Sequence, residues 1–253
     1  MPRSCEIRLF PIALDGAIVP GDDLAEKLAA ALRHQRLKLT SGDIVVVKHK
    51  IVSKAEGNVA PLSRVRVSRA AKSWARSSGT DARVVQLALS EGRRVVRKKN
   101  GVLITQTRHG FVCANSGVDV SNVDGGASAV LLPRDPDASA AKLRSRLKKL
   151  CAAEVAVIIS DSFGRPWREG LTEVAIGVAG MKPLIDYRGR KDAHGYKLHA
   201  TAEAVADEIA CAAGLVCGKL NRTPVCIVRG FPFHAGRGTA RELIRPAKND
   251  LFR

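Results

Sequence analysis

The chain has 253 residues and is 45% hydrophobic, which is ordinary for a globular domain and sufficient to bury a substantial core. Its 42 Lys and Arg residues outnumber its 24 Asp and Glu residues, which gives a formal net charge of +18. No apolar run approaches the length of a membrane span and the N-terminus lacks a signal-peptide core, so we expect a cytoplasmic location and no membrane partner.

The excess of positive charge has three interpretations. A nucleic-acid-binding protein is often this basic, but it usually adds a basic tail, a recognisable module or stacking aromatics, and aromatic residues make up only 4% here. Alternatively, the surface attracts polyanionic substrates, or the charge serves solubility alone. The basic residues are spread along the chain, so we expect no nucleic-acid partner and keep a basic nucleic-acid-binding protein as an alternative.

Apolar runs and helical periodicities predict the elements of the fold. Strands are expected at 7–10, 44–47, 84–85, 95–96, 102–104, 130–132, 155–159 and 225–228. Helices are expected over 22–32, 139–150 and 201–213, where apolar residues recur at helical spacing. The two types alternate without regular βαβ spacing, which favours an α+β fold with mixed β-sheets and packed helices.

Breaks and motifs limit the domain organisation. A turn-rich segment at 133–137 is where two lobes would meet, but the segments on both sides carry candidate site residues, so we expect a single domain over 1–253. The six cysteines show no CxxC spacing and the six histidines no HxxxH spacing, which predicts buried free thiols and no zinc site. The chain has no P-loop or Rossmann glycine motif, so a nucleotide would be held in another way.

The predicted strand at 155–159 leads directly into Asp161 and Ser162. We expect the strand to end at Ser160, and the ends of buried strands are where α/β-type proteins commonly place their chemistry. A carboxylate beside a hydroxyl is a hard oxygen set suited to Mg²⁺ or Mn²⁺. Arg165 and Arg168, which follow, can hold phosphate or carboxylate. The segment predicts a metal-assisted reaction on an anionic substrate.

Three further polar segments are candidates for the same site. The segment 113–126 supplies a second carboxylate, Asp119, and an amide, Asn122, although its composition is also that of a surface turn. In the segment 48–57, Lys54 would bind phosphate, or the lysines would guard a strand edge. Arg190, in the basic loop 188–192, would clamp an anion or remain solvated.

Five segments, taken together and in order, resemble one family, the coenzyme F420-0:L-glutamate ligases, also called F420-0 gamma-glutamyl ligases. The resemblance covers the chain from about residue 10 to residue 230. It is to the stand-alone form of the family, which lacks the C-terminal flavin-reductase-like domain of some relatives. The segments are Val52-Ser53-Lys54-Ala55-Glu56-Gly57, Asn115-Ser116-Gly117-Val118-Asp119-Val120-Ser121-Asn122, Asp161-Ser162-Phe163-Gly164-Arg165, Gly189-Arg190-Lys191-Asp192 and Val205-Ala206-Asp207-Glu208-Ile209-Ala210.

The resemblance implies the F420-0 gamma-glutamyl ligase-like fold and a GTP-dependent amide ligase. Such an enzyme joins L-glutamate to the lactyl carboxylate of coenzyme F420-0 through an acyl phosphate, and can add further γ-linked glutamates. It also implies two divalent ions, Mg²⁺ or Mn²⁺, a monovalent cation such as K⁺, and a homodimer. A metal-dependent phosphotransferase or hydrolase on the same scaffold would use the same metal residues and remains an alternative.

Residue roles follow from the same resemblance. It implies Asp119 and Asp161 as metal ligands and Ser162, where relatives often carry threonine, as a ligand of the second ion. Arg165, Arg168 and Arg190 are the candidates for substrate binding. The implied GTP-binding residues are Asp15, Gly16, Ala17, Ile18, His49, Lys54, Asn122, Gly218 and Lys219.

Lys219 departs from the pattern of the family. Some relatives have an acid-containing loop at this place that contributes to metal and nucleotide binding, and a protonated lysine is no metal ligand. Either Lys219 contacts phosphate directly, or the second metal has fewer protein ligands here; the first is the interpretation that we favour.

Overall fold

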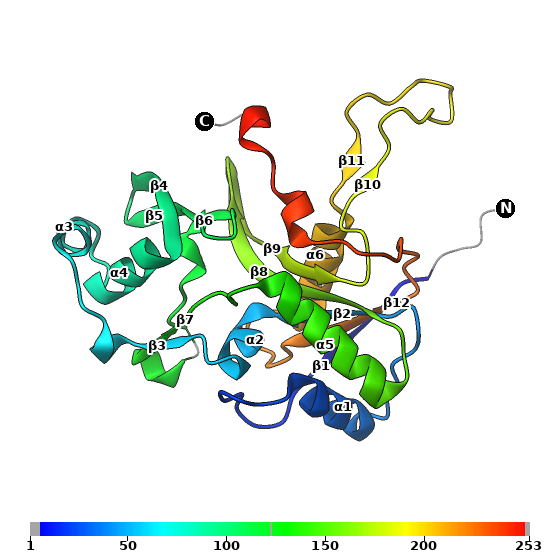
Figure 1. Cartoon of the computed structure of the whole chain (residues 1–253), viewed down its shortest axis with the longest axis horizontal. Helices are drawn as coiled ribbons and strands as arrows, with labels where there is room; N and C mark the ends of the chain where they lie inside the picture. The colour runs from blue at the N-terminus through cyan, green and yellow to red at the C-terminus, as the bar shows by residue number, and fades with distance from the viewer. Residues whose placement is uncertain (1–5, 122, 251–253) are drawn as a thin grey trace.

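The centre of the molecule is a five-stranded sheet with the strand order β1-β12-β2-β8-β9 (Figure 1). The computed structural model describes residues 6–121 and 123–250. β2 and β8 are parallel and the other pairs are antiparallel, so the expected mixed sheet with packed helices is confirmed. Its strands are β1 (Arg8–Ile12), β12 (Val225–Arg229), β2 (Ile44–Lys48), β8 (Ala156–Arg165) and β9 (Arg168–Ala179).

Helices cover both faces of this sheet. α1 (Leu24–His34) and α5 (Pro136–Cys151) lie on one face, and α6 (Val205–Cys217) lies on the other (Figure 1). Side chains alternate along β2, so Val45 and Val47 join the core under α1 and α5, while Ile44 and Val46 join the core under α6. A strand buried on both faces needs an unbroken apolar run, which is why this strand could be predicted from sequence.

A second part of the molecule, residues 59–130, is inserted between α2 (His49–Ala55) and α5 and lies to the left in Figure 1. Leu62, Val84, Ala88 and Leu103 contribute to its separate core. Its helices are α3 (Arg69–Ser78) and α4 (Ala82–Glu91), and its strands are β3 (Val59–Pro61), β4 (Gly92–Lys99), β5 (Val102–Thr107), β6 (Val112–Ala114) and β7 (Ser128–Val130). The chain returns to the central sheet at 133–137; the division into domains stays a prediction.

Some predictions of secondary structure were wrong, either in the type of element or in its boundary. The predicted strand at 84–85 lies within α4, where Asp81 caps the helix and Val84, Val85 and Ala88 are buried at helical spacing. The predicted helix over 201–213 begins at Val205, because β11 (Ala202–Glu203) pairs with β10 (Ile185–Asp186) just before it. Short 3₁₀ helices complete the described elements, at Leu62–Arg64, Asn115–Gly117, Asp124–Gly126, Ala240–Leu243 and Ala247–Asn249.

The strand expected to end at Ser160 runs on to Arg165 and turns back directly into β9. Asp161 and Ser162 therefore lie inside a strand and do not follow one. The pairing of β8 with β9, not the local composition, extends the strand over polar residues.

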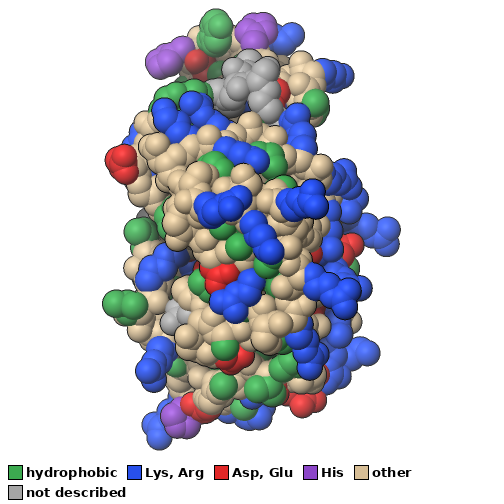
Figure 2. Space-filling model, turned by 90° about the vertical axis from the view of Figure 1, so that its left-hand side faces the viewer, with side chains coloured by type: hydrophobic (Ala, Val, Ile, Leu, Met, Phe, Trp, Pro, Cys, Tyr) green, Lys and Arg blue, Asp and Glu red, His purple; other side chains and the backbone are tan. Residues whose placement is uncertain are grey.

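The surface is basic on the side formed by the inserted part. Figure 2 shows that side of the molecule, where Lys and Arg side chains are far more prominent than Asp and Glu. The edge strand β4 alone exposes five cationic residues, and such charges discourage a free edge from pairing with another chain. They are Arg93, Arg94, Arg97, Lys98 and Lys99.

The expectation of buried free thiols is met by three of the cysteines. Within the described residues, Cys113, Cys217 and Cys226 are buried free thiols, whereas Cys151 and Cys211 are free and partly exposed; Cys5 lies outside those residues. Burial, and then the Asp161 carboxylate, raise the pKa of Cys113 to about 12. Across residues 6–121 and 123–250, no helix combines the length and the apolar character of a membrane span.

Candidate functional site

Four chain segments meet at one edge of the central sheet. Because β2 and β8 are parallel, with Lys48 opposite Ser160, their carboxyl ends lie side by side. β9 returns antiparallel beside β8 and places Glu173 opposite Ser162. β12 runs antiparallel to β2, so the loop 218–224 that precedes it reaches the same edge. The sheet thereby gathers side chains that are far apart in the sequence.

Glu173 is the centre of the first cluster, and its side chain is only 7% exposed. Its Oε1 lies 2.6 Å from Lys48 Nζ and 3.3 Å from Lys219 Nζ, and it accepts from Ser162 Oγ at 2.6 Å. Ser160 Oγ donates to Oε2 at 3.0 Å, and Lys219 also contacts the Ser162 hydroxyl. Burial raises the pKa of Glu173, but the hydrogen bonds and the ammonium charges outweigh it and lower the pKa to about 2. The carboxylate is therefore ionised at neutral pH.

Asp161 belongs to a second cluster on the opposite face of β8. Successive side chains of a strand alternate between faces, so Ser162 faces Glu173 and Asp161 faces away from it. Ser162 N donates to Asp161 Oδ1 at 2.7 Å, and His49 Nε2 lies 3.3 Å from the same oxygen. His49 is 2% exposed, and its buried Nδ1 has no partner within the described residues. Both contacts engage Oδ1, and among the described residues no hydrogen bond engages Oδ2.

Asp119 approaches the same region from the inserted part. Its Oδ2 lies 2.7 Å from Lys50 Nζ, and its Oδ1 accepts from Ser121 N at 2.6 Å. Burial raises the pKa of Asp119, but the hydrogen bonds from Lys50 and Ser121 outweigh burial and lower it. His49 and Lys50 are consecutive at the start of α2. Asp161 contacts the first of them and Asp119 contacts the second, so one short helix links the two carboxylates.

The remaining residues of the predicted nucleotide site come from separate chain segments. Asn122 lies outside the described residues. The segment 15–18 belongs to a largely exposed loop between β1 and α1, and Lys54 lies in the last turn of α2. Gly218 follows α6 with φ +59°, a left-handed value that favours glycine, and turns the chain so that Lys219 reaches Glu173. The roles of these residues stay predictions.

The three arginines predicted to bind substrate lie further out. Arg165 and Arg168 flank the turn between β8 and β9, and Arg165 Nη2 donates to Glu169 O at 2.8 Å. Arg190 lies 5.4 Å above the Tyr187 ring, in the arm between β10 and β11 that projects from the body (Figure 1). Among the described residues, no hydrogen bond or ion pair links these arginines to Glu173 or Asp161, so their function stays a prediction.

The carboxylates of Asp119 and Asp161 are candidate ligands for one hard divalent ion, which would take the place of the Lys50 ammonium at Asp119 Oδ2. Asp161 Oδ2 and the Asp119 carboxylate are oxygen donors of the type that Mg²⁺ and Mn²⁺ prefer, and Mg²⁺ commonly uses one or two carboxylates and retains water. No group of three or more His, Cys, Asp or Glu side chains forms a metal cluster in the described part of the chain. The implied second ion does not fit beside Ser162, because two ammonium groups, those of Lys48 and Lys219, already face the single Glu173 carboxylate there, and Lys219 also contacts the Ser162 hydroxyl.

Sequence reasoning missed Glu173 as a site residue. It lies in β9, eleven residues after Ser162 and with no motif around it, and only the strand register brings the two together. Lys48 and Lys50 were within a candidate segment but had no assigned role. A prediction that β2 and β8 pair in parallel would have placed Lys48 beside Ser160 and so near the candidate site.

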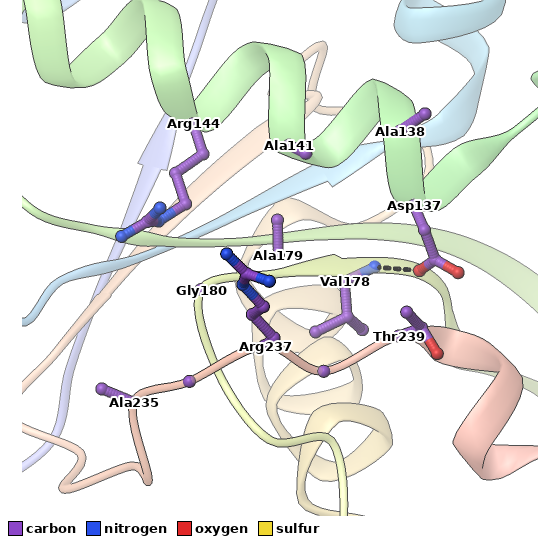
Figure 3. Close-up of a pocket in the computed structure, with 12 residues that line it drawn as sticks. Asp137, Ala138, Ala141, Arg144, Val178, Ala179, Gly180, Ala235, Arg237 and Thr239 are labelled. Atoms are coloured by element: carbon purple, nitrogen blue, oxygen red, sulfur yellow. Dashed lines mark hydrogen bonds between the residues drawn. The ribbon is translucent and has the colours of Figure 1, made fainter.

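A separate cavity lies at the other end of β9 and contains none of the predicted site residues. It has a volume of about 550 Å³ and is lined by α5, the end of β9 and the loop 235–239. Figure 3 shows Arg144 and Arg237 extending toward it from opposite walls. At its rim, Asp137 Oδ1 accepts from Val178 N and from Ala240 N, both at 2.8 Å. These bonds tie α5, β9 and the C-terminal segment together.

Comparison with known proteins gives one consistent result. The family model described as F420-0:Gamma-glutamyl ligase matches residues 15–230. The chain is 45% identical over 236 residues to the Coenzyme F420:L-glutamate ligase of Methanothermobacter thermautotrophicus, covering 92% of this chain and 93% of that protein. It is 42% identical over 252 residues to the protein of the same name from Methanopyrus kandleri, covering 98% of both chains.

Proposed function

The chain belongs to the F420-0:gamma-glutamyl ligase family, and from that premise we propose that it joins L-glutamate to the carboxylate of coenzyme F420-0 through an amide bond. The observation that carries the proposal is similarity over nearly the whole chain to proteins named Coenzyme F420:L-glutamate ligase. The edge of the central sheet supports it with the ionised carboxylates and lysines that phosphoryl transfer needs.

The proposed reaction has two steps and uses GTP. A bare carboxylate is a poor electrophile, so a carboxylate oxygen first attacks the γ-phosphorus of GTP and GDP leaves. The glutamate amine then attacks the carbonyl carbon of the acyl phosphate, inorganic phosphate leaves, and the amine loses a proton. The protein contributes mainly positioning and neutralisation of charge.

We propose a separate role for each group of side chains. Asp119 and Asp161 would hold Mg²⁺ or Mn²⁺, which when bound neutralises phosphate oxygens. Lys48 and Lys219 supply positive charge on the other face of β8. We further propose that Lys54 contacts the nucleotide phosphates and that the arginines after β8 contact the acidic substrates.

Product analysis tests the function directly. The protein is incubated with the deazaflavin precursor, GTP, Mg²⁺ and L-glutamate, and mass spectrometry follows the precursor. The expected result is a mass increase of one glutamate residue with one GDP formed per amide bond, and any further γ-linked additions appear as repeats of that increase. GDP release that is equally fast without glutamate and deazaflavin would instead identify a phosphotransferase or hydrolase.

The basic surface in Figure 2 keeps nucleic-acid binding as a second candidate. That candidate requires Asp119→Asn and Asp161→Asn to leave nucleic-acid binding intact or stronger, since both changes remove negative charge. The ligase proposal requires the same variants to abolish glutamate-dependent GDP release.

Light scattering tests the proposed homodimer, and exchange of K⁺ for Na⁺ in the assay tests the proposed monovalent cation.

A further inference from the structure

An ammonium group bridges the two oxygens that a second divalent ion would need. Lys219 Nζ contacts Ser162 Oγ and lies 3.3 Å from Glu173 Oε1. Serine hydroxyl and glutamate carboxylate are both hard oxygen donors suited to Mg²⁺ or Mn²⁺. A lysine ammonium offers three N–H donors and no lone pair, so it competes with a metal for these oxygens and cannot join its ligands.

The charge around Glu173 is unfavourable for another cation. The single carboxylate already faces two ammonium groups, because Lys48 Nζ lies 2.6 Å from the same Oε1 that Lys219 approaches. A divalent ion on that oxygen would lie within a few ångströms of both positive charges, where repulsion in a half-buried site is strong. It would bind only after displacing a lysine.

Three contacts position Glu173, one at its carboxylate, one at its backbone carbonyl and one along its side chain. Ser160 Oγ donates to its second oxygen at 3.0 Å, and Cys211 Sγ donates to its backbone carbonyl at 3.1 Å. α6 packs so closely that a Cβ atom at Gly214 would lie 2.6 Å from Glu173 Cγ. Lys219 follows this same helix, so the packing that positions the carboxylate also delivers the ammonium.

We propose that the Lys219 ammonium takes the place of a second divalent cation, so that each chain binds one Mg²⁺ or Mn²⁺, at Asp119 and Asp161. This proposal rests on the ligase function for its substrate, the phosphates of GTP. The ammonium then acts as a fixed point charge toward phosphate oxygens, on the face of β8 opposite to the metal ion.

Counting bound ions tests the proposal without any activity measurement. The metal-free protein is titrated with Mn²⁺ alone, and the free ion is counted by electron paramagnetic resonance. The wild type is expected to bind one ion per chain. Lys219→Glu, which replaces the ammonium with a third oxygen donor beside Ser162 and Glu173, is expected to bind two. Lys219→Ala, which only frees the two oxygens, is expected to show a second and weaker site.

A matched variant controls for the change in net charge. Lys191 is exposed in the projecting arm, and Lys191→Glu alters the charge as Lys219→Glu does, with an expected count of one ion. The Lys219 side chain is 61% exposed, so its variants are expected to unfold at the wild-type urea concentration, which confirms that they are folded. A wild-type count of two or of none overturns the proposal, and so does a count of one in a folded Lys219→Glu protein.

The product assay separates this proposal from the proposed function. If the wild type forms the amide product and binds two ions, the ligase function is supported and the proposed role of Lys219 is wrong. A wild type that binds one ion but forms no product with any nucleotide loses the ligase function, whatever the count in the variants.

Discussion

His49 Nε2 lies 3.3 Å from Asp161 Oδ1, and this pair of a buried and a partly exposed side chain links the start of α2 to the middle of β8. The contact fixes the carboxylate through the oxygen that Ser162 N also engages, so the other oxygen keeps a defined direction. In the proposed metal site His49 would orient Asp161, and loss of such an orienting group commonly lowers metal affinity by about 10- to 100-fold.

Replacing His49 is therefore expected to weaken metal binding. His49→Ala removes the lateral support of Asp161, and Mn²⁺ affinity measured by calorimetry should fall by roughly 10- to 100-fold. His194, which is exposed in the projecting arm, provides the matched control, and His194→Ala should bind Mn²⁺ as the wild type does. Equal affinities for all three proteins would show that His49 does not position Asp161.

Glu173 should contribute much more to stability than a neighbouring glutamate of the same strand. Glu173→Gln leaves the half-buried Lys48 ammonium without its counter-charge, and loss of one partner of a buried pair costs about 3 kcal/mol. Glu169→Gln, at an exposed position of β9, should change the free energy of unfolding by less than about 0.5 kcal/mol. Urea denaturation of both variants measures the difference, and equal midpoints would contradict the assigned ion pair.

Two glycines of the β8–β9 hairpin should respond differently to alanine. A Cβ at Gly177 would lie 2.3 Å from the Pro136 backbone carbonyl oxygen, so α5 would have to move away from the sheet. Overpacking of this kind costs about 1–3 kcal/mol or more. A Cβ at Gly164 would meet only Leu171 at 3.9 Å, and Gly164→Ala should be close to neutral. Thermal unfolding compares the two, and a neutral Gly177→Ala would place α5 further from β9.

Asp137 should stabilise the junction of α5, β9 and the C-terminal segment. Asp137→Ala leaves the Val178 and Ala240 N–H groups without their acceptor, at a cost of about 1–3 kcal/mol for each buried group. Asp137→Asn keeps an acceptor oxygen and should lose less. Urea denaturation near neutral pH gives both values, and an Asp137→Ala protein as stable as Asp137→Asn would rule out this contribution.

The same carboxyl group predicts a pH dependence. Burial raises the pKa of Asp137 above its ordinary value of 3.8, so the folded state binds this proton more tightly than the unfolded state. The part of its stabilisation that comes from proton binding is complete below pH 3.8 and is lost as the pH rises through the raised pKa, while the two backbone hydrogen bonds remain. The difference in unfolding free energy between wild type and Asp137→Asn should decrease over that range; a difference that increases with pH would mean a lowered pKa.

The central strands could be predicted because burial on both faces demands continuous apolar runs, as at Ile44–Lys48 and Val225–Arg229. The inserted part was harder, because the β-branched pair at Val84 and Val85 favours a strand locally while Asp81 and the packing of Ala88 make it a helix. Local preference was overridden there by tertiary contacts.

The sequence by itself determined which residue types are present for the chemistry: two carboxylates, a hydroxyl and several lysines, in segments characteristic of one family. Only the tertiary structure decided which of these side chains lie together on each face of β8. Strand alternation sets the face of a side chain, and the strand register sets its partners. Asp161 thus faces His49, while its neighbour Ser162 joins Glu173 and Lys219 on the other side of β8. Glu173 and Lys219 are 46 residues apart, and their contact depends on how α6 packs against β9.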